Sequence, residues 1–181
     1  MTSESVVAII LARGGSKGIP KKNVRLFGGS PLVEWCLNAA LKSQKIDSVI
    51  LSSDSEEILD CGRKLNCEIH KRSEEHSQDT TTSEESMLAV INEHPIAKSA
   101  EVLILVQPTS PFTKPEDFDA ALELFEHGEY DSLVTGVSDH SFSWEIDEAG
   151  NATPKYNPKS RPRRQDMKSF RKENGAFYIT K

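Results

Sequence analysis

The sequence has few of the features that direct a chain into or across a membrane. Its N-terminus carries no basic segment, and its longest apolar run covers only residues 6–12. A signal peptide needs a longer apolar segment with a cleavage site, and a membrane-spanning helix needs about 20 apolar residues. We therefore expect a soluble cytoplasmic protein with no membrane partner.

Cysteine and histidine are also scarce. The three cysteines, Cys36, Cys61 and Cys67, form no pair with the spacing of a metal site, and the five histidines pair neither with them nor with one another at ligand spacing. The residues alone therefore assign no zinc and no other protein-bound metal. Cys36 and Cys61 lie in helical patterns, which favours buried free thiols in a reducing compartment.

The chain lacks the net positive charge that is typical of proteins that bind nucleic acid non-specifically. Its formal net charge is −6, with 36% hydrophobic and 28% charged residues, an ordinary composition for one globular domain. Non-specific binding to nucleic acid is therefore not expected. Positive charge is nevertheless clustered over residues 13–25 and 155–164, which suits a small anionic ligand better than a long polyanion.

Four continuous apolar runs predict strands that are buried on both faces. They cover residues 6–12, 49–51, 102–106 and 133–137, and residues 173–180 return as one more strand. Helical patterns lie over residues 31–43, 55–65, 83–94 and 115–127. This alternation predicts a mostly parallel sheet with helices on both faces. The fold class we expect is a three-layer α/β/α domain over residues 1–181.

Capping spacings predict where two of these helices begin. Asp54 with Glu57, and Thr113 with Glu116, have the spacing of a capping box. Asp54 has a second interpretation, in which its carboxylate faces the loop after the first strand and stabilises it, but the N-cap is favoured. Residues 138–172 show little periodicity, and a long irregular stretch of this kind is often functional or contacts a partner.

The segment LARGGSKGIPKKN, residues 11–23, is the first indication of a ligand. Gly14, Gly15 and Gly18 predict positive φ angles and a close approach of the backbone to an anion. Arg13, Lys17, Lys21 and Lys22 add full charges. The spacing fits neither a Walker loop nor a dinucleotide-binding fingerprint. The pattern therefore predicts phosphate binding of a different kind, in preference to a flexible turn with solvated lysines.

Three polar motifs each follow a predicted strand. They are ARGGSKG after residues 6–12, SSDSEE after residues 49–51 and QPTSP after residues 102–106. Ligands of open parallel sheets bind beyond the carboxyl ends of the strands. We therefore expect one site built from all three motifs.

Together, these motifs resemble those of the acylneuraminate cytidylyltransferases, also called CMP-sialic acid synthetases. The resemblance rests on LARGGSKGIPKKN, SSDSEEI, HKRSEEHSQDTTTSEES, QPTSPF, RPRRQD and ENGAFYI, in that order along nearly the whole chain. It implies a Rossmann-like nucleotidyltransferase fold and an enzyme that transfers CMP from CTP to N-acetylneuraminate, releasing pyrophosphate. Phosphoryl transfer of this kind depends mainly on positioning and on charge neutralisation.

The resemblance also implies roles for individual residues. Lys22, Arg13 and Gln107 would be catalytic, the two cations by holding the triphosphate and Gln107 by orienting the sugar. The nucleotide-binding set would be Ala12, Arg13, Gly14, Ser16, Lys17, Lys22, Asn23, Arg72 and Ser83. The sugar-binding set would be Gln107, Arg163, Arg164, Gln165, Asn174, Phe177 and Tyr178. Phe177 or Tyr178 has the alternative interpretation of strand core, and in TTTSEES only Ser83 is assigned a role beyond the helix start.

Residues 161–166, RPRRQD, have three interpretations. They form a solvated basic loop, or they contribute to a nuclear import signal over 159–164, or, as the resemblance implies, they bind the carboxylate of the acidic nine-carbon sugar. We favour the third, with residues 138–172 as a dimerisation and substrate-binding extension of a homodimer or higher homo-oligomer. An import role is compatible with it.

The resemblance further implies Mg²⁺ as a cofactor, bound in the family by aspartates that follow the stretch matching ENGAFYI. The chain ends at Lys181, before such a segment, so we expect it to be C-terminally truncated. Three alternatives follow: the same chemistry on another nonulosonic acid, a truncated non-catalytic partner that binds CTP, and a basic interaction module that does not bind CTP.

Overall fold

The computed structural model describes residues 5–16, 18–73, 75–78, 80–128, 130–166 and 170–181, with the backbone alone at 164 and 170. The Lys17 prediction lies outside the described residues. The chain forms two compact units, of which one comprises Met1–Thr135 with Gly175–Lys181 and the other Gly136–Asn174. In the described part of the chain, no helix is both long and apolar enough to span a bilayer.

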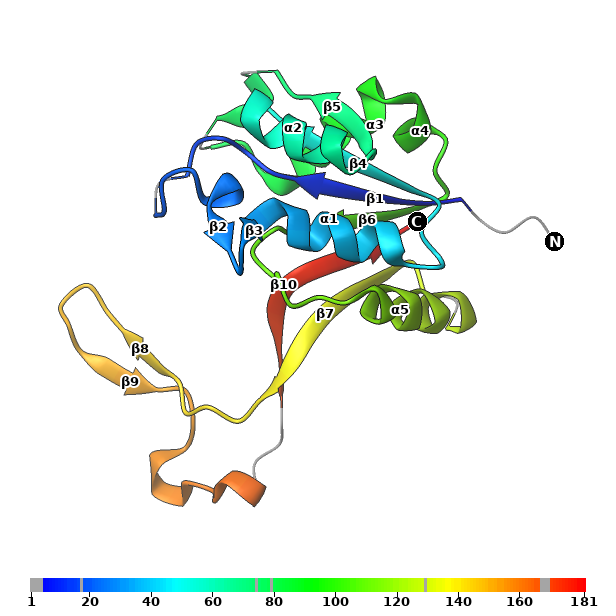
Figure 1. Ribbon diagram of the computed structural model, residues 1–181. Coiled ribbons are helices and arrows are strands. Elements are labelled where there is room, and N and C mark those ends of the chain that lie inside the picture. The colour runs from blue at the N-terminus through cyan, green and yellow to red at the C-terminus, as the bar shows by residue number, and fades with distance from the viewer. Residues whose placement is uncertain (1–4, 17, 74, 79, 129, 167–169) are drawn as a thin grey trace. The chain divides into compact units, whose positions relative to one another are not determined.

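The first unit is built on a six-stranded sheet with the order β5-β4-β1-β6-β10-β7 (Figure 1). The strands are β1 (Val6–Leu11), β4 (Ser48–Ser53), β5 (Glu68–Lys71), β6 (Val102–Val106), β7 (Ser132–Asp139) and β10 (Phe170–Thr180). β5, β4, β1 and β6 are parallel, whereas β10 is antiparallel to β6. The mostly parallel α/β sheet predicted from the apolar runs is therefore confirmed.

The register explains why the central strands β1 and β6 are apolar throughout, whereas β7, over the predicted run 133–137, is largely exposed. Successive side chains of a strand point to opposite faces, so a strand covered on both sides needs apolar residues at every position. Ala8 and Ile10 of β1 lie in one core cluster, and Val7 and Ile9 lie in the other. Ile10 is paired with Leu51 of β4 and Val106 of β6, which fixes the three strand ends at one edge of the sheet.

Helices cover both faces, as Figure 1 shows. α1 (Leu32–Lys42), α2 (Glu56–Lys64) and α5 (Pro115–His127) contribute to the first core cluster, whereas α3 (Ser83–Glu93) and α4 (Pro95–Lys98) contribute to the second. The connection from β1 to α1 contains the short 3-10 helix η1 (Lys22–Val24) and the hairpin β2 (Leu26–Phe27)–β3 (Ser30–Pro31). The connection from β5 to α3 contains the short 3-10 helix η2 (Glu75–Ser77). The predicted three-layer arrangement is confirmed.

Both predicted N-caps are wrong by one residue. α2 is capped by Ser55, because Ser53 still belongs to β4 and the helix begins at Glu56. α5 is preceded by Lys114, whose backbone N–H donates to the Asp117 carboxylate at 2.8 Å, because Pro115 is best placed at the first helical position. The Thr113 hydroxyl instead donates to the Ser110 carbonyl at 3.0 Å.

The second unit contains the hairpin β8 (Trp144–Ile146)–β9 (Ala152–Pro154) and the 3-10 helices η3 (Pro158–Ser160) and η4 (Arg164–Asp166). The Arg161 guanidinium lies 4.2 Å from the ring centre of Phe142. The sequence pattern predicted an irregular segment here, and the hairpin was missed because its strands are only three residues long and largely exposed. A role for this unit in dimerisation or substrate binding stays a prediction.

Candidate functional site

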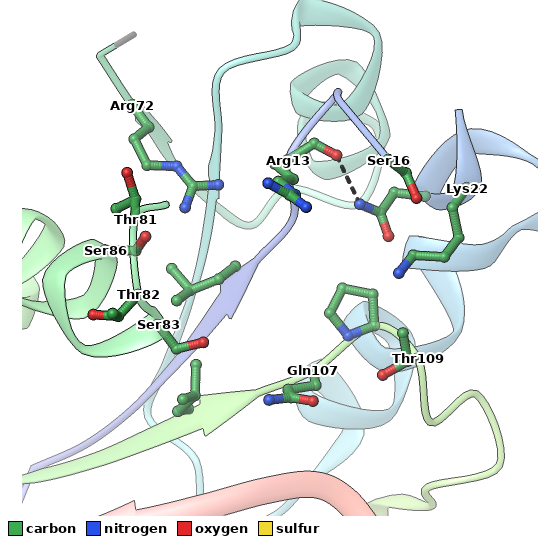
Figure 2. A pocket seen from close by; sticks show the side chains of 14 residues that line it. Arg13, Ser16, Lys22, Arg72, Thr81, Thr82, Ser83, Ser86, Gln107 and Thr109 are labelled. Atoms are coloured by element: carbon green, nitrogen blue, oxygen red, sulfur yellow. Dashed lines mark hydrogen bonds between the residues drawn. The ribbon is translucent and has the colours of Figure 1, made fainter. Parts of the chain in front are cut away.

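A cavity of about 310 Å³ opens at the carboxyl ends of the parallel strands. Arg13 lies two residues after β1, Arg72 directly follows β5, and Gln107 directly follows β6. Figure 2 shows Arg72 and Thr81–Ser83 on one side, Ser16 and Lys22 on the other, and Arg13 between them. The lining residues are Leu11, Arg13, Ser16, Lys22, Asn23, Arg72, Thr81, Thr82, Ser83, Ser86, Leu105, Gln107, Pro108 and Thr109.

The loop after β1 is held in place by two hydrogen bonds to its backbone. The Gly14 N–H donates to Asp54 Oδ1 at 2.8 Å, and the Asn23 side-chain amide donates to the Arg13 carbonyl at 2.9 Å. The favoured interpretation of Asp54 as an N-cap is therefore wrong. Its carboxylate instead stabilises the basic loop, which was the second interpretation.

The glycines of this loop do not have the backbone conformation that the sequence pattern predicted. Gly14 and Gly15 lack the positive φ angles that the sequence pattern predicted, and the Gly14 N–H is already bound to Asp54. Gly14 is required for a different reason, because a Cβ atom there would lie 2.9 Å from the Cβ of Ser55. Within the described residues of this loop, the positive φ of 52° belongs to Lys21.

The two neighbouring lysines point to different partners. The exposed Lys21 ammonium pairs with the Glu57 carboxylate of α2 at 2.9 Å. Lys22 begins η1 and is half-buried against the cavity, where Figure 2 shows its ammonium directed inward. The left-handed backbone at Lys21 thus separates a surface ion pair from a cation that lines the cavity.

Arg72 is the most buried cation of the cavity. Its side chain is 6% exposed, and Nη2 donates to the Ser52 carbonyl at 3.5 Å. Burial lowers the pKa of the guanidinium, Asp54 opposes this shift, and Arg13 adds to it. Within the described part of the chain, Arg72 Nε and Asn23 Oδ1 are buried without a hydrogen-bond partner. A buried cation with an unpaired donor is an arrangement that an anionic or polar ligand would stabilise.

The N-terminal end of α3 contributes hydroxyl groups that the sequence analysis missed. Thr82 caps the helix in a capping box with Glu85, so the helix begins at Ser83. Ser83 and Ser86 are one helical turn apart and therefore lie on the same face. Only Ser83 was predicted, although the spacing of the helix start would have pointed to Ser86 as well. Thr81, Thr82 and Thr109 were missed for lack of any such periodic signal.

Gln107 lies at the floor of the cavity, next to β10 (Figure 2). Its backbone N–H donates to the Ala176 carbonyl at 3.0 Å, and the Ser110 hydroxyl donates to the Gly175 carbonyl at 3.4 Å. Gly175 has a φ of 64°, and a Cβ atom added there would lie 3.1 Å from Gln107 Oε1. The strand β10 therefore supports the side chain of Gln107 from below.

Several predicted site residues lie elsewhere. Ala12 is buried at the end of β1, where its N–H donates to the Ser52 carbonyl at 3.0 Å. Phe177 is 3% exposed and packs on Phe118 with ring centres 4.6 Å apart, so its interpretation as core is correct. Tyr178, the next residue of β10, is half-buried.

The predicted arginine-rich element belongs to the second unit. Arg163 is exposed and pairs with Asp166 at 2.6 Å, and Gln165 and Asn174 are exposed. Arg164 lies in η4, but its side chain, like Lys17, lies outside the described residues. Their roles in sugar binding stay predictions.

The residues of the cavity do not form a protein-bound metal site. Among the lining residues that the structure describes there is no carboxylate, and no group of three or more His, Cys, Asp or Glu side chains that could hold a metal ion occurs in the described ranges. Mg²⁺ is usually bound through one or two carboxylates together with the phosphates of its substrate. The described lining residues therefore do not fit a dedicated magnesium site.

Comparison with known proteins gives matches over nearly the whole chain. The chain is 39% identical to N-acylneuraminate cytidylyltransferase A of Danio rerio and 38% identical to N-acylneuraminate cytidylyltransferase of Oncorhynchus mykiss, covering 99% and 96% of this chain. It spans 42% and 40% of the length of those relatives. It is also 34% identical to a CMP-N,N'-diacetyllegionaminic acid synthase of Legionella pneumophila, over 81% of this chain and 65% of that relative.

Solved structures share the fold. A CMP:2-keto-3-deoxy-manno-octonic acid synthetase solved in complex with CTP superposes with a TM-score of 0.68 at 18% identity, over 97% of this chain and 73% of that one. A 4-diphosphocytidyl-2C-methyl-D-erythritol synthase from Anaerococcus prevotii gives a TM-score of 0.65 at 18% identity, over 98% and 71%. The model of the family described as cytidylyltransferase matches residues 7–178, and the chain therefore belongs to the cytidylyltransferase family.

Proposed function

We propose that this chain binds CTP in the cavity beyond β1, β5 and β6 and transfers CMP to N-acetylneuraminate. The observation that carries the proposal is a cavity with three cations, Arg13, Lys22 and Arg72, and no carboxylate among its described lining residues. Such a cavity favours a compact polyanion such as a nucleoside triphosphate. The names of the relatives at 38% and 39% identity favour N-acylneuraminate as the acceptor.

The two sides of the cavity suit the two ends of the nucleotide. Arg13 and Lys22, which flank the loop after β1, would neutralise the triphosphate. Arg72 and Ser83 on the opposite side, with its several hydroxyl groups, would hold the cytidine. Lys22 is only half-buried and lies in a short 3-10 helix, so its ammonium is available to a ligand at little expense to packing.

The reaction requires an in-line attack of the sugar's anomeric hydroxyl on the α-phosphorus. A new O–P bond forms to the sugar, the bond to the leaving pyrophosphate breaks, and the hydroxyl proton is released. Gln107 would orient the hydroxyl, because a neutral amide can hold it without a competing charge. Arg13 and Lys22 would stabilise the charge that develops on pyrophosphate, as preorganised cations do in phosphoryl transfer. Assays of the transfer need Mg²⁺, because nucleoside triphosphates bind it through their own phosphate oxygens.

Calorimetric titration of CTP into the chain tests the nucleotide half of the proposal. We expect saturable binding of CTP, weakened about tenfold or more by Lys22→Ala, since one charge-assisted contact contributes about 1.5–3 kcal/mol. Lys21→Ala is the matched control, because Lys21 is the adjacent lysine but pairs with Glu57 on the surface. Equal affinity of the two variants, or no binding of CTP to the unaltered chain, would overturn the assignment.

A second part of the proposal concerns recognition of the sugar acid and the oligomeric state of the enzyme. We infer that Arg163, Arg164 and Gln165 contribute to recognition of the sugar's carboxylate and that the enzyme acts as a homodimer. Bidentate arginine pairs are the usual protein partners of carboxylates, which supports this inference. Arg164→Ala should raise the KM for the sugar acid and leave the Kd for CTP unchanged. An equal effect on both constants would move Arg164 to the nucleotide.

A further inference from the structure

Three polar side chains that are not among the lining residues of the cavity form a hydrogen-bonded line. Ser52 Oγ of β4 lies 3.0 Å from His70 Nδ1 of β5, and His70 Nε2 lies 3.0 Å from Glu93 Oε2 of α3. Ser52 is fully buried and His70 is 6% exposed, whereas the Glu93 side chain is 49% exposed. The Ser52–His70–Glu93 line therefore runs from solvent into the edge of the sheet.

The chemistry of the three groups fixes the direction of the hydrogen bonds. The Glu93 carboxylate can only accept, so His70 Nε2 carries the hydrogen that it donates to Glu93. In the neutral imidazole, Nδ1 then accepts from the Ser52 hydroxyl, and each of the three groups has its partner. Ser52 Oγ has no access to a substrate, since the residue is 0% exposed. The line is therefore a device for holding positions and not a nucleophilic triad.

Ser52 is also hydrogen-bonded to the two segments that carry Arg13 and Arg72. Its carbonyl accepts the Ala12 N–H at 3.0 Å, one residue before Arg13, and Arg72 Nη2 at 3.5 Å. His70 and Arg72 are two residues apart in the extended chain, so their side chains lie on the same face. The Arg72 N–H donates to the Ser53 carbonyl at 2.9 Å, which continues the pairing of β5 with β4. His70 and Arg72 thus bind the same residue of β4 through its side chain and its carbonyl.

Glu93, at the other end of the line, connects it to α3. Glu93 is the last residue of α3, and the first turn of that helix places Ser83 and Ser86 on the cavity. A helix moves largely as a rigid rod, so a contact at one end restricts the other. β5 is an edge strand of only four residues, with β4 as its one neighbour in the sheet order. Within the described residues, polar side-chain contacts between this edge and the end of α3 are His70–Glu93 at 3.0 Å and the longer Glu68–His94 at 3.9 Å.

We propose that His70 is a positioning residue for nucleotide binding. Through Ser52 and Glu93 it sets the separation between the Arg72 guanidinium and the hydroxyl groups at the start of α3. That the ligand held between them is a nucleotide rests on the proposed function. A histidine outside the cavity thus determines how tightly the nucleotide binds, although it neither contacts the nucleotide nor takes part in the transfer step.

Three substitutions at His70 separate the two halves of the line. His70→Asn keeps a polar atom near the position of Nδ1 and so retains the bond to Ser52, and His70→Gln keeps one near Nε2 and so retains the bond to Glu93. His70→Leu removes both. His94→Gln is the matched control, because His94 follows α3 and faces Glu68 of β5, the same two elements, but at 3.9 Å, beyond hydrogen-bond distance.

The first measurement is amide hydrogen exchange without nucleotide. We expect His70→Leu to accelerate exchange at Arg72 and Ser86, whose N–H groups donate to Ser53 and Thr82, with the core strand β1 unaffected. His94→Gln should leave both amides unchanged. Ser52→Ala, a smaller change that keeps the fold, should reproduce the effect of His70→Leu at Arg72. Unchanged exchange at both amides in His70→Leu and Ser52→Ala would overturn the inference whatever the chain binds.

The second measurement is CTP affinity together with turnover. We expect His70→Leu to raise the Kd for CTP about tenfold with kcat at saturating CTP within twofold, and His70→Asn to recover most of the affinity. Adding Ser52→Ala to His70→Leu should weaken binding little further, since both remove the same bond. An unchanged Kd, or an equal rise in His94→Gln, would overturn the nucleotide role. If the unaltered chain binds no CTP while the exchange effects appear, the proposed function fails and the mechanical link stands without a nucleotide to position.

Discussion

Replacing Gly175 by alanine adds one methyl group at the point where β10 supports Gln107. The backbone there has a φ of 64°, and the new Cβ atom would lie 3.1 Å from Gln107 Oε1. The left-handed conformation costs a non-glycine residue about 1–2 kcal/mol, offset by about 0.5 kcal/mol from the lower entropy of the unfolded chain. The backbone alone therefore predicts a loss of about 1 kcal/mol in the free energy of unfolding.

Gly29 isolates that backbone contribution. It has a φ of 93° in the turn between β2 and β3, and no atom lies within 4 Å of an added Cβ. Urea unfolding of Gly29→Ala should therefore show the backbone loss alone. Gly175→Ala should lose a further ~0.5 kcal/mol, because Gln107 must leave its rotamer. We also expect the KM for the sugar acid to rise about fivefold while the Kd for CTP stays unchanged.

Combining Gly175→Ala with Gln107→Ala tests whether the contact is the cause. Without the Gln107 amide the methyl group has room, so the additional loss of stability should disappear in the double variant. Equal losses of stability in Gly175→Ala and Gly29→Ala, with an unchanged KM for the sugar, would show that the methyl group does not displace Gln107.

Three further predictions concern groups around the cavity and the core. Asp54→Ala should lower the free energy of unfolding by about 2 kcal/mol, because the Gly14 N–H loses a charged acceptor, whereas Asp54→Asn should lose less than half of that in urea unfolding; equal losses would contradict the role of the carboxylate. Burial lowers the pKa of His94 from 6.5, so the folded state binds its proton less readily than the unfolded state, and stability should fall as the pH drops below 6.5. His94→Gln should flatten this fall between pH 7.5 and 5.5, and an unchanged slope would contradict it. Burial raises the pKa of the buried Cys36 to about 12 and that of the half-buried Cys67 to about 11, so iodoacetamide at pH 8 should alkylate both slowly until urea is added, and rapid labelling of Cys36 in the native chain would contradict its burial.

The central strands could be predicted because burial on both faces leaves a simple pattern. Residues 102–106 are apolar at every position, and β6 has these bounds. β5 was missed because it is a short edge strand with exposed Glu68 and Lys71 at its ends and the more buried Ile69 and His70 between them. A strand with one neighbour and four residues has no continuous apolar run to reveal it.

The loop after β1 shows which part of a site a sequence can reveal. Its cations were recognised, and Arg13 and Lys22 do line the cavity. The reason for Gly14 was not, since a glycine needed for a positive φ and one needed for close packing against Ser55 look the same in a sequence. The partner of Asp54 was also ambiguous, because a capping box is defined by spacing alone, whereas the end of β4 decides where α2 begins.

The bond between His70 and Ser52 could not be predicted at all. The two residues are 18 positions apart, and their contact depends on the register that pairs Ser52 with His70 across β4 and β5. Ser86 was within reach of prediction, because it follows Ser83 by one helical turn. Contacts set by strand register thus need the structure, while contacts set by helical periodicity do not.

The proposed function requires the cavity cations to activate CTP toward a sugar acid. The most direct test is pyrophosphate release by the purified chain with CTP, Mg²⁺ and N-acetylneuraminate, measured beside Lys22→Ala and the Lys21→Ala control. We expect release that depends on the sugar, is matched by CMP-sugar formation, and is lost in Lys22→Ala but kept in Lys21→Ala. Release that is independent of the sugar, or equal in the two lysine variants, would contradict it.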